Sequence, residues 1–368
     1  MRVLRVIAKL EPGGAQFAAF RLSDALRPLG IESVLVAGES TPLGVEVARE
    51  HGYEVECMLD HVAGLQWTPS HDFARWLGAR LDGYDVVHGH MFGAWWALAQ
   101  VVPDGAPLVG SEHNTLTWPG RPHHREMRAA LRRVDLFFAH GPAAYAYVRA
   151  LGCPPERLVL GRSAIAGERC EPLPGLPSPR IVAASRLAPD KGPDLLVEAL
   201  ARLPDAPPAF LLGEGDLREP LQRRVQELGI AHRVAFPGWQ REPGRWIKGA
   251  RVYVQPSREE AWSQSVVLAM AVGTPVVATN VEGLPRVLGE GRGITVPPED
   301  PDALAAAIGD VLSGRRTPDV DAARAYALRF TPERLGREVA GYYERLAGGA
   351  GDRWTTLVQV SSSSSSGP

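Results

Sequence analysis

Short apolar segments alternate with amphipathic segments along most of this chain, and this alternation limits the fold more than any other feature. An apolar segment at residues 4–10 is followed by a Gly-Gly loop and a helical pattern over residues 15–29. Further strand candidates in the first half of the chain lie at residues 33–38, 53–58, 85–90, 107–114 and 135–141. Strands that alternate with helices form a parallel sheet covered on both faces. We therefore predict an α/β domain for this half.

A proline-rich segment, EPLPGLPSP at residues 171–179, interrupts the alternation, which then begins again. A helix is expected over residues 192–203, and strands are expected at residues 180–185, 209–215, 233–238, 250–257, 274–280 and 293–298. Open parallel sheets bind ligands at the carboxyl ends of their strands. Two doubly wound, Rossmann-like domains joined by a hinge therefore predict a deep cleft between them, in which both domains share one substrate.

The domain boundaries follow from this pattern. Residues 1–170 are predicted to form the N-terminal domain, residues 171–179 a hinge and residues 180–330 the C-terminal domain. Residues 331–350 are predicted to form a helix that can pack back on the N-terminal domain. Thr331 is its expected N-cap, and Pro332 its first helical residue. The serine-rich residues 351–368 are expected to be disordered and carry no fold argument.

Composition excludes several classes of protein. The chain has 368 residues and a net charge of −2, which gives no electrostatic case for nucleic-acid binding. The three cysteines, Cys57, Cys153 and Cys170, have no CxxC or zinc-site spacing and are typical of reduced thiols. No signal peptide and no apolar run of membrane-spanning length is evident. We expect a cytoplasmic protein, with peripheral attachment to a membrane as the alternative.

Three loops at expected strand ends carry groups that suit an anionic ligand. Gly13 and Gly14 precede a helix, where they form either a tight turn or a loop whose amides approach a phosphate. Arg186 and Lys191 follow the first strand of the second domain, and the chain has only three lysines. Two cations there suit a diphosphate, although ordinary surface charge is the alternative. Glu260 precedes a helix predicted over residues 261–272. Its carboxylate either binds a ligand or simply caps the helix.

Histidines form a fourth cluster, with His88 and His90 on one side of a strand and His113 after the next strand. No third ligand of suitable spacing accompanies the pair, so we predict no metal site. His113 is either a polar contact in the cleft or a satisfied core histidine. The DxD formed by Asp319 and Asp321 lies in a late helical region and is expected to be solvated.

The chain resembles the retaining glycosyltransferases of the GT-B fold, family four. The resemblance covers nearly the whole chain in order and rests on the combination of motifs GGAQ, DVVHGH, SEHN, SRLAPDKGPDLLVEAL, GEGDLREPL, VAFPGW, PSREEAWSQSVVLAMAVGTPVVAT and EGLPRVL. Such enzymes bind a nucleotide sugar mainly on the C-terminal domain and an acceptor mainly on the N-terminal domain. They retain anomeric configuration, and the favoured mechanism is front-face attack without a protein nucleophile.

The resemblance implies roles for individual residues. Arg186 and Lys191 would neutralise the diphosphate of the donor, and Glu260 would lie beside the transferred sugar. His113 would also lie near the sugar, and Gly13 and Gly14 would approach the diphosphate. Backbone amides would bind hydroxyls and phosphate oxygens at Ala261, Trp262, Ser263, Gln264 and Ser265. The base pocket would be walled by residues around Gly213, Gly215, Pro237 and Trp239. No cofactor and no metal would be needed.

Several positions depart from the family pattern. Leu268 stands where a second glutamate would bind the ribose, and Arg286 stands where a glutamate is usual. These departures leave open a catalytically silent relative that binds a nucleotide sugar or partners an active subunit. A sugar-nucleotide epimerase of the same fold is a further alternative.

The acceptor is expected to carry a hydroxyl group, on a saccharide, a lipid-linked sugar or a small molecule. The basic stretch at residues 121–135 could contact an anionic membrane, as in relatives that glycosylate lipids. The alternative, a solvated helix face, is favoured.

Overall fold

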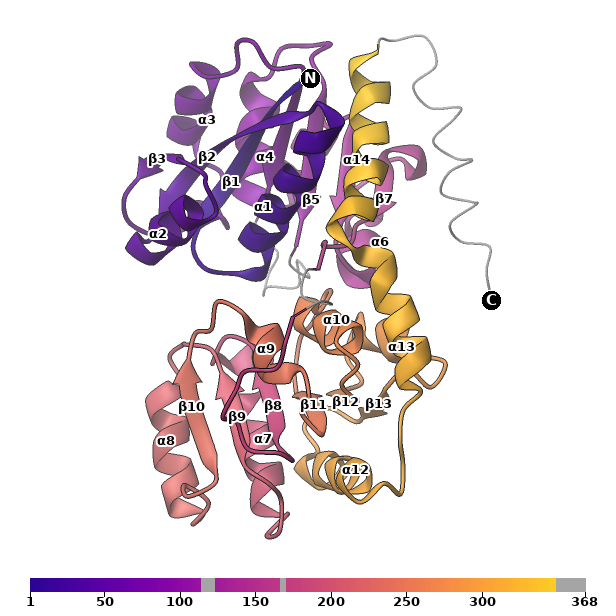
Figure 1. Ribbon diagram of the computed structural model, residues 1–368. Helices are drawn as coiled ribbons and strands as arrows, with labels where there is room; N and C mark the ends of the chain where they lie inside the picture. Colours follow the sequence, from indigo (N-terminus) through magenta and orange to yellow (C-terminus); the bar gives the residue numbers. More distant parts are fainter. Residues whose placement is uncertain (114–122, 166–169, 349–368) are drawn as a thin grey trace. The chain divides into compact units, whose positions relative to one another are not determined.

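The structure is a computed structural model, and it describes residues 1–113, 123–165 and 170–348. The tail predicted at residues 351–368 and the first two residues of the basic stretch lie outside these ranges. The chain divides into two compact units (Figure 1). Unit 1 contains Met1–Ala164 and the C-terminal helix that begins at Pro332, and unit 2 contains Ile165–Thr331.

The described part of unit 1 contains a seven-stranded sheet in the order β3-β2-β1-β4-β5-β6-β7, in which every pairing is parallel. The strands are β1 (Arg2–Leu10), β2 (Glu32–Ser40), β3 (Glu56–Leu59), β4 (Val86–His90), β5 (Leu108–Glu112), β6 (Leu136–Ala139) and β7 (Leu158–Leu160). The sequence predicted all of them except β7, which is only three residues long.

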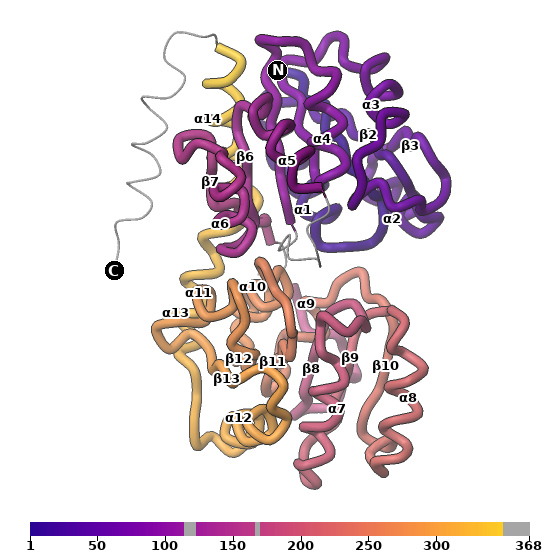
Figure 2. The backbone as a smooth tube through the Cα atoms, turned by 180° about the vertical axis from the view of Figure 1, so that it is seen from behind, coloured from indigo at the N-terminus to yellow at the C-terminus, as the bar shows by residue number. Residues whose placement is uncertain are grey.

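Helices cover both faces of this sheet. They are α1 (Gly14–Leu26), α2 (Pro42–Glu50), α3 (His71–Gly78), α4 (Phe92–Val101), α5 (His124–Leu131), α6 (Pro142–Ala150) and α14 (Pro332–Ala347). Helices α3, α4 and α5 lie together on one face (Figure 2), whereas α1 and α14 pack side by side on the other. Gly336 permits this close packing, because an added Cβ would lie 2.9 Å from the Cβ of Ala25.

The described part of unit 2 repeats the arrangement with six parallel strands in the order β10-β9-β8-β11-β12-β13. The strands are β8 (Ile181–Ala184), β9 (Ala209–Leu212), β10 (Val234–Gly238), β11 (Val252–Gln255), β12 (Val276–Thr279) and β13 (Ile294–Val296). The helices are α7 (Pro193–Ala201), α8 (Arg218–Glu227), α9 (Pro243–Ile247), α10 (Gln264–Ala271), α11 (Leu284–Leu288), α12 (Pro301–Ser313) and α13 (Val320–Ala327).

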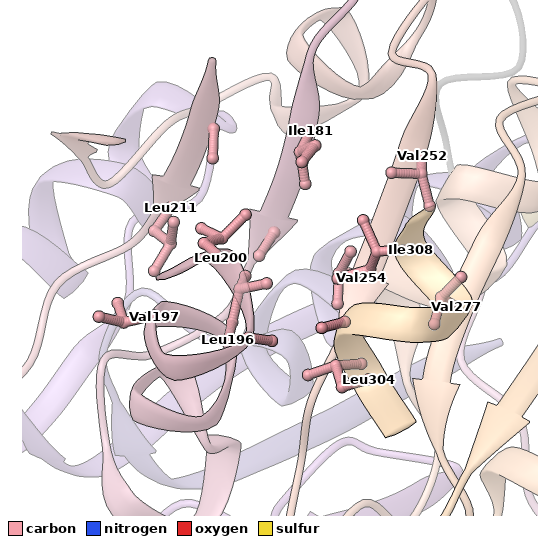
Figure 3. Close-up of a cluster of buried hydrophobic side chains, with 14 of the residues drawn as sticks. Ile181, Leu196, Val197, Leu200, Leu211, Val252, Val254, Val277, Leu304 and Ile308 are labelled. Atoms are coloured by element: carbon pink, nitrogen blue, oxygen red, sulfur yellow. The ribbon is translucent and has the colours of Figure 1, made fainter. Parts of the chain in front are cut away.

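The core of unit 2 lies between its sheet and helices α7 and α12. Ile181 and Val254 on the sheet face Leu196, Leu304 and Ile308 on the helices (Figure 3). Buried apolar strands covered by helices on both faces are what parallel sheets require. The predicted pair of Rossmann-like, doubly wound domains is therefore confirmed, with the strand order of dinucleotide-binding sheets in each unit.

The ends of several elements differ from the prediction. Helix α1 ends at Leu26, and residues 27–29 form a 3-10 turn that contains Pro28. Helix α10 begins at Gln264 instead of residue 261, because the Ser263 hydroxyl accepts the amide of Val266 as an N-cap.

The segment predicted as a hinge, residues 171–179, is attached to unit 2. The amide of Leu173 donates to the carbonyl oxygen of Arg245 at 2.9 Å, and the Arg245 side chain donates to the carbonyl oxygen of Glu171 at 3.3 Å. The two units meet in sequence between Ala164 and Ile165, a few residues before the predicted boundary at 170.

Candidate functional site

The switch point of the unit 2 sheet lies between β8 and β11, where the strand order reverses direction. Ligands of such sheets bind outside the carboxyl ends of the strands at this point. The loop after β8 carries Arg186 and Lys191, and the loop after β11 carries Glu260. The predicted diphosphate-binding and sugar-binding residues of unit 2 therefore flank one switch point.

Lys191 and Glu260 meet directly. The Nζ of Lys191 lies 3.3 Å from Oε2 of Glu260 and donates to the carbonyl oxygen of Glu259 at 3.1 Å. Their side chains are only 19% and 11% exposed. Burial lowers the pKa of Lys191, but the nearby carboxylates of Glu260 and Asp190 outweigh this effect, so the pKa lies above its usual value. The lysine is therefore fully charged at neutral pH.

Arg186 is placed differently from Lys191. Its side chain is 60% exposed and donates to Oδ2 of Asp190 at 3.0 Å. The same oxygen lies 3.5 Å from Nζ of Lys191. Asp190 thus draws two cations together while it cancels part of their charge.

Polar groups beneath Glu260 hold the loop after β11. Tyr253 donates from its hydroxyl to Oε1 of Gln255 at 2.7 Å, and Nε2 of Gln255 donates to Oγ of Ser257 at 2.7 Å. Oγ of Ser257 lies 3.5 Å from Oε2 of Glu260. The backbone amide of Glu260 donates to Oε2 of Glu282 at 2.9 Å. Sequence reasoning missed these supports; the signal was the two polar residues Gln255 and Ser257 at the end of a buried strand.

Glycines bring the loops of unit 2 together. Gly213 has φ +129°, and an added Cβ would lie 1.9 Å from the carbonyl oxygen of Ser185. A Cβ on Gly215 would lie 2.4 Å from the carbonyl oxygen of Leu187. A Cβ on Gly192 would lie 2.2 Å from the carbonyl oxygen of Pro256. Only glycine permits these approaches, so the loops after β8, β9 and β11 pack as one layer.

The segment before α10 is held partly by aromatic packing. The ring of Trp262 packs edge-on against Phe330, with centroids 5.0 Å apart, and Ala261 and Ser263 are buried. Ser263 also lies 3.3 Å from Ser265, oxygen to oxygen. Gln264 begins the helix. Ligand binding by the amides of residues 261–265 stays a prediction.

Leu268 and Trp239 lie on other parts of unit 2. Trp239 is half-buried and follows β10. Its place in the wall of a base pocket stays a prediction. Leu268 on α10 faces α9, because an added Cβ on Gly244 would lie 3.5 Å from its Cδ1. Cys170 Sγ would lie 3.2 Å from the same Cβ, so Cys170 and Leu268 both lie beside Gly244. Arg286 on α11 is exposed.

Unit 1 holds the other predicted residues. Gly13 is the N-cap residue of α1 and Gly14 begins that helix, directly after β1. Gly13 has an extended backbone with φ −157°, so its conformation does not require glycine. Gln16 donates to the carbonyl oxygen of Lys9 at 2.6 Å, which fixes the turn between strand and helix.

The histidines of unit 1 form a stacked column that includes one residue the sequence reading left out. The ring centroids of His88 and His90 are 4.2 Å apart, those of His90 and His113 5.7 Å, and those of His113 and His140 4.0 Å. Burial lowers the pKa of His113 to about 4 and lowers the other three well below their usual value. All four are neutral at pH 7.

The histidine column borders a small cavity. The cavity has about 40 Å³ of room for water and is lined by His113 and His140, by the segment after β7 and by α1 and α14. A water needs about 10–15 Å³ measured in this way, so a few waters fit.

No three metal-binding side chains converge on one point in the part of the chain that the structure describes. Asp319 of the DxD caps α13 by accepting the amide of Ala322 at 2.9 Å.

Across residues 1–113, 123–165 and 170–348, no helix has the length and apolar character needed to cross a membrane. Of the predicted basic stretch, α5 presents Arg125 and Arg128 as exposed residues, whereas Arg133 pairs with Asp135 at 3.3 Å.

Comparison with solved structures bears on the fold. Anabaena Alr3699/HepE, in a crystal structure with UDP and glucose, superposes with a TM-score of 0.80 at 21% identity, over 93% of this chain and 98% of that one. Sucrose-phosphate synthase from Thermosynechococcus elongatus gives a TM-score of 0.77 at 20% identity, over 95% of this chain and all of that one. At such identities these likenesses establish the GT-B fold alone.

Comparison with protein sequences bears on the family. Residues 12–160 match the family model described as Glycosyltransferase Family 4, and residues 178–314 match Glycosyl transferases group 1. A D-inositol 3-phosphate glycosyltransferase of Streptomyces scabiei is 30% identical over 302 residues, which are 71% of this chain and 67% of that protein. The lipopolysaccharide core biosynthesis glycosyltransferase LpsE of Rhizobium meliloti is 29% identical, over 50% of this chain and 55% of its own length. The chain belongs to the family 4, group 1 glycosyltransferases.

Proposed function

We propose that this glycosyltransferase moves a sugar from a nucleotide sugar to a hydroxyl acceptor and retains the anomeric configuration. The observation that carries the proposal is the Lys191–Glu260 pair at the switch point of unit 2, with Nζ and Oε2 3.3 Å apart. A fixed cation beside a fixed carboxylate suits a ligand with a diphosphate at one end and sugar hydroxyls at the other.

The chemistry assigned to these residues is electrostatic. Lys191 and Arg186 stabilise the charge that grows on the diphosphate as the bond from the anomeric carbon to the phosphate oxygen breaks. The acceptor oxygen bonds to the anomeric carbon from the same face, and its proton passes to the departing phosphate oxygen. Glu260 accepts hydrogen bonds from hydroxyls of the sugar and orients it.

The proposal includes independence from metal ions. Its support is that two cations of the chain itself, Arg186 and Lys191, lie in the loop after β8, and they would neutralise a bound diphosphate in place of a divalent ion. Turnover that is unchanged by a chelator is the expected result. A cytoplasmic location, with peripheral membrane attachment as the alternative, stays a prediction.

A catalytically silent nucleotide-sugar-binding relative, alone or as the partner of an active subunit, is the second candidate function. It is favoured by Leu268, which lies against α9 as an apolar side chain where the family carries a carboxylate. In that case, a nucleotide would bind and no donor would turn over.

The test is release of free nucleotide from a panel of nucleotide sugars, with and without hydroxyl-bearing acceptors. UDP-glucose is the first donor to try, because structural neighbours were solved with UDP and UDP-glucose. Acceptor-dependent release supports the proposal, and the anomeric proton coupling of the product decides retention. Binding without release favours the silent relative, whereas a new nucleotide sugar formed without acceptor favours an epimerase.

A further inference from the structure

Arg5 lies at the centre of unit 1, in the middle of strand β1, and its side chain is fully buried. Burial of a charged group is costly unless polar partners surround it. The partners of Arg5 in the described structure are neutral. Its Nε donates to Oγ of Ser33 at 3.3 Å, and its Nη2 donates to the hydroxyl oxygen of Tyr343 at 2.9 Å. Its Nη1 lies 3.3 Å from Nε2 of His90.

The contact with His90 determines which nitrogen of that ring carries hydrogen. A guanidinium nitrogen can only donate, so Nε2 of His90 must accept from it. Because burial and the neighbouring Arg5 guanidinium hold the pKa of His90 well below its usual value, the ring is neutral and its hydrogen resides on Nδ1.

The same reasoning extends to the next ring. Nδ1 of His90 lies 3.4 Å from Nε2 of His113 and donates to it. His113 is also neutral, so a ring that accepts at Nε2 must carry its own hydrogen on Nδ1. Stacking on His140 at 4.0 Å holds the plane of the ring.

We infer that Arg5 and His90 are positioning residues that set the tautomer of His113, so that His113 offers an Nδ1–H donor. The inference rests on the proposed function in one respect: His113 is the histidine expected beside the transferred sugar. A donor there can bind a sugar oxygen, whereas the other tautomer would present a lone pair at the same place.

Arg5 also begins a second chain of hydrogen bonds, which runs through Tyr343 to His88 and provides an internal control. Tyr343 on α14 accepts from Arg5, so its hydroxyl hydrogen is directed to Nδ1 of His88 at 2.6 Å. His88 then carries hydrogen on Nε2, which donates to Ser111 at 2.7 Å. One buried cation thus orders two chains of hydrogen bonds, and His88 and His113 are predicted to be opposite tautomers.

The test is two-bond proton–nitrogen correlation NMR of the full chain labelled with 15N-histidine, at neutral pH and without substrate. Signals are assigned with His113→Gln and His88→Gln. We expect His113 with hydrogen on Nδ1 and His88 with hydrogen on Nε2. Hydrogen on Nε2 of His113 in the unaltered protein would overturn the inference.

Single substitutions distinguish the chain of hydrogen bonds that leads to His113 from the one that leads to His88. Arg5→Met removes the donor and should move the tautomer ratio of His113 by up to about tenfold, the worth of one hydrogen bond. Arg5→Lys keeps a donor and should keep the tautomer. Tyr343→Phe should alter the signals of His88 and leave those of His113 in place. If Arg5→Met leaves the ratio unchanged in a folded protein, the inference fails.

If Arg5→Met does not fold, two changes at His90 replace it. His90→Asn places an amide near the position of Nδ1 and should retain the tautomer of His113. His90→Gln places the amide near the position of Nε2, so the tautomer of His113 should no longer be fixed. The opposite result, or no difference between the two variants, counts against the inference that His90 sets the tautomer of His113. Where turnover is measurable, kcat/KM should follow the tautomer ratio. Because the spectra are recorded without substrate, absence of transferase activity would leave the tautomer result intact.

Discussion

Replacing Lys191 with methionine tests the donor site at its most constrained contact. Methionine keeps much of the length and apolar volume of the side chain and removes the ammonium group. The group lost lies 3.3 Å from Oε2 of Glu260 and is mostly shielded from solvent, with 19% of the lysine side chain exposed. The change therefore removes one fixed positive charge from the loop after β8.

Two magnitudes follow from this geometry. A hydrogen bond to a charged group is worth about 1.5–3 kcal/mol, so affinity for a nucleoside diphosphate should fall roughly 10- to 150-fold. Removing one partner of a fully buried ion pair costs about 3–5 kcal/mol. This pair keeps some solvent contact, so we expect a loss of unfolding free energy of about 1–2 kcal/mol.

The assay is isothermal titration with UDP, ADP and GDP, together with chemical denaturation of each variant. Lys248→Met is the matched control, because Lys248 is a partly buried lysine of the same unit that pairs with Glu171 at 3.7 Å, away from the switch point. We expect Lys248→Met to bind like the unaltered protein. Unchanged affinity in a folded Lys191→Met protein, or an equal loss in both variants, would refute the reasoning.

Four further outcomes are expected. Asp190→Asn should tighten nucleoside diphosphate binding about fivefold in titrations, because it frees Arg186 from a carboxylate 3.0 Å away; weaker binding would contradict this. Gly283→Ala should cost about 1–3 kcal/mol in denaturant unfolding, since the added Cβ would lie 2.2 Å from a backbone oxygen of the preceding loop; a neutral change would show that the loop yields freely. Leu268→Glu should tighten nucleotide binding if the ribose lies beside α10, and flat or lower affinity would place it elsewhere. Because the pKa of Lys191 is raised on folding, its stabilisation is complete below its usual value of 10.5 and is lost as pH rises through the folded value; unfolding of Lys191→Met should lack this alkaline decline.

The sequence predicted most of the fold because the alternation of strands and helices is regular. Strand β7 escaped prediction because three residues carry no periodicity. The start of α10 was misplaced because glutamate and alanine at residues 260 and 261 favour a helix, whereas the Ser263 cap sets its true start. The hinge at residues 171–179 stays a prediction, and the hydrogen bonds of this segment to Arg245 could not be read from composition.

The candidate site was predictable in part. Arg186, Lys191 and Glu260 were identified from their place at strand ends, and the structure brings Lys191 and Glu260 into contact. The carboxylate of Asp190 between the cations and the supports from Tyr253 to Ser257 depend on side-chain geometry that spacing does not encode. The same holds for Arg5, which in the sequence is one of three basic residues of an otherwise apolar strand.

The most direct test of the central claim, that the switch point of unit 2 holds the donor, is hydrogen exchange of the full chain with and without a nucleotide sugar that binds it. We expect slower exchange in peptides that cover residues 185–192 and 256–267, and loss of this protection in Lys191→Met. Protection confined to other segments, or equal protection in the variant, would contradict it.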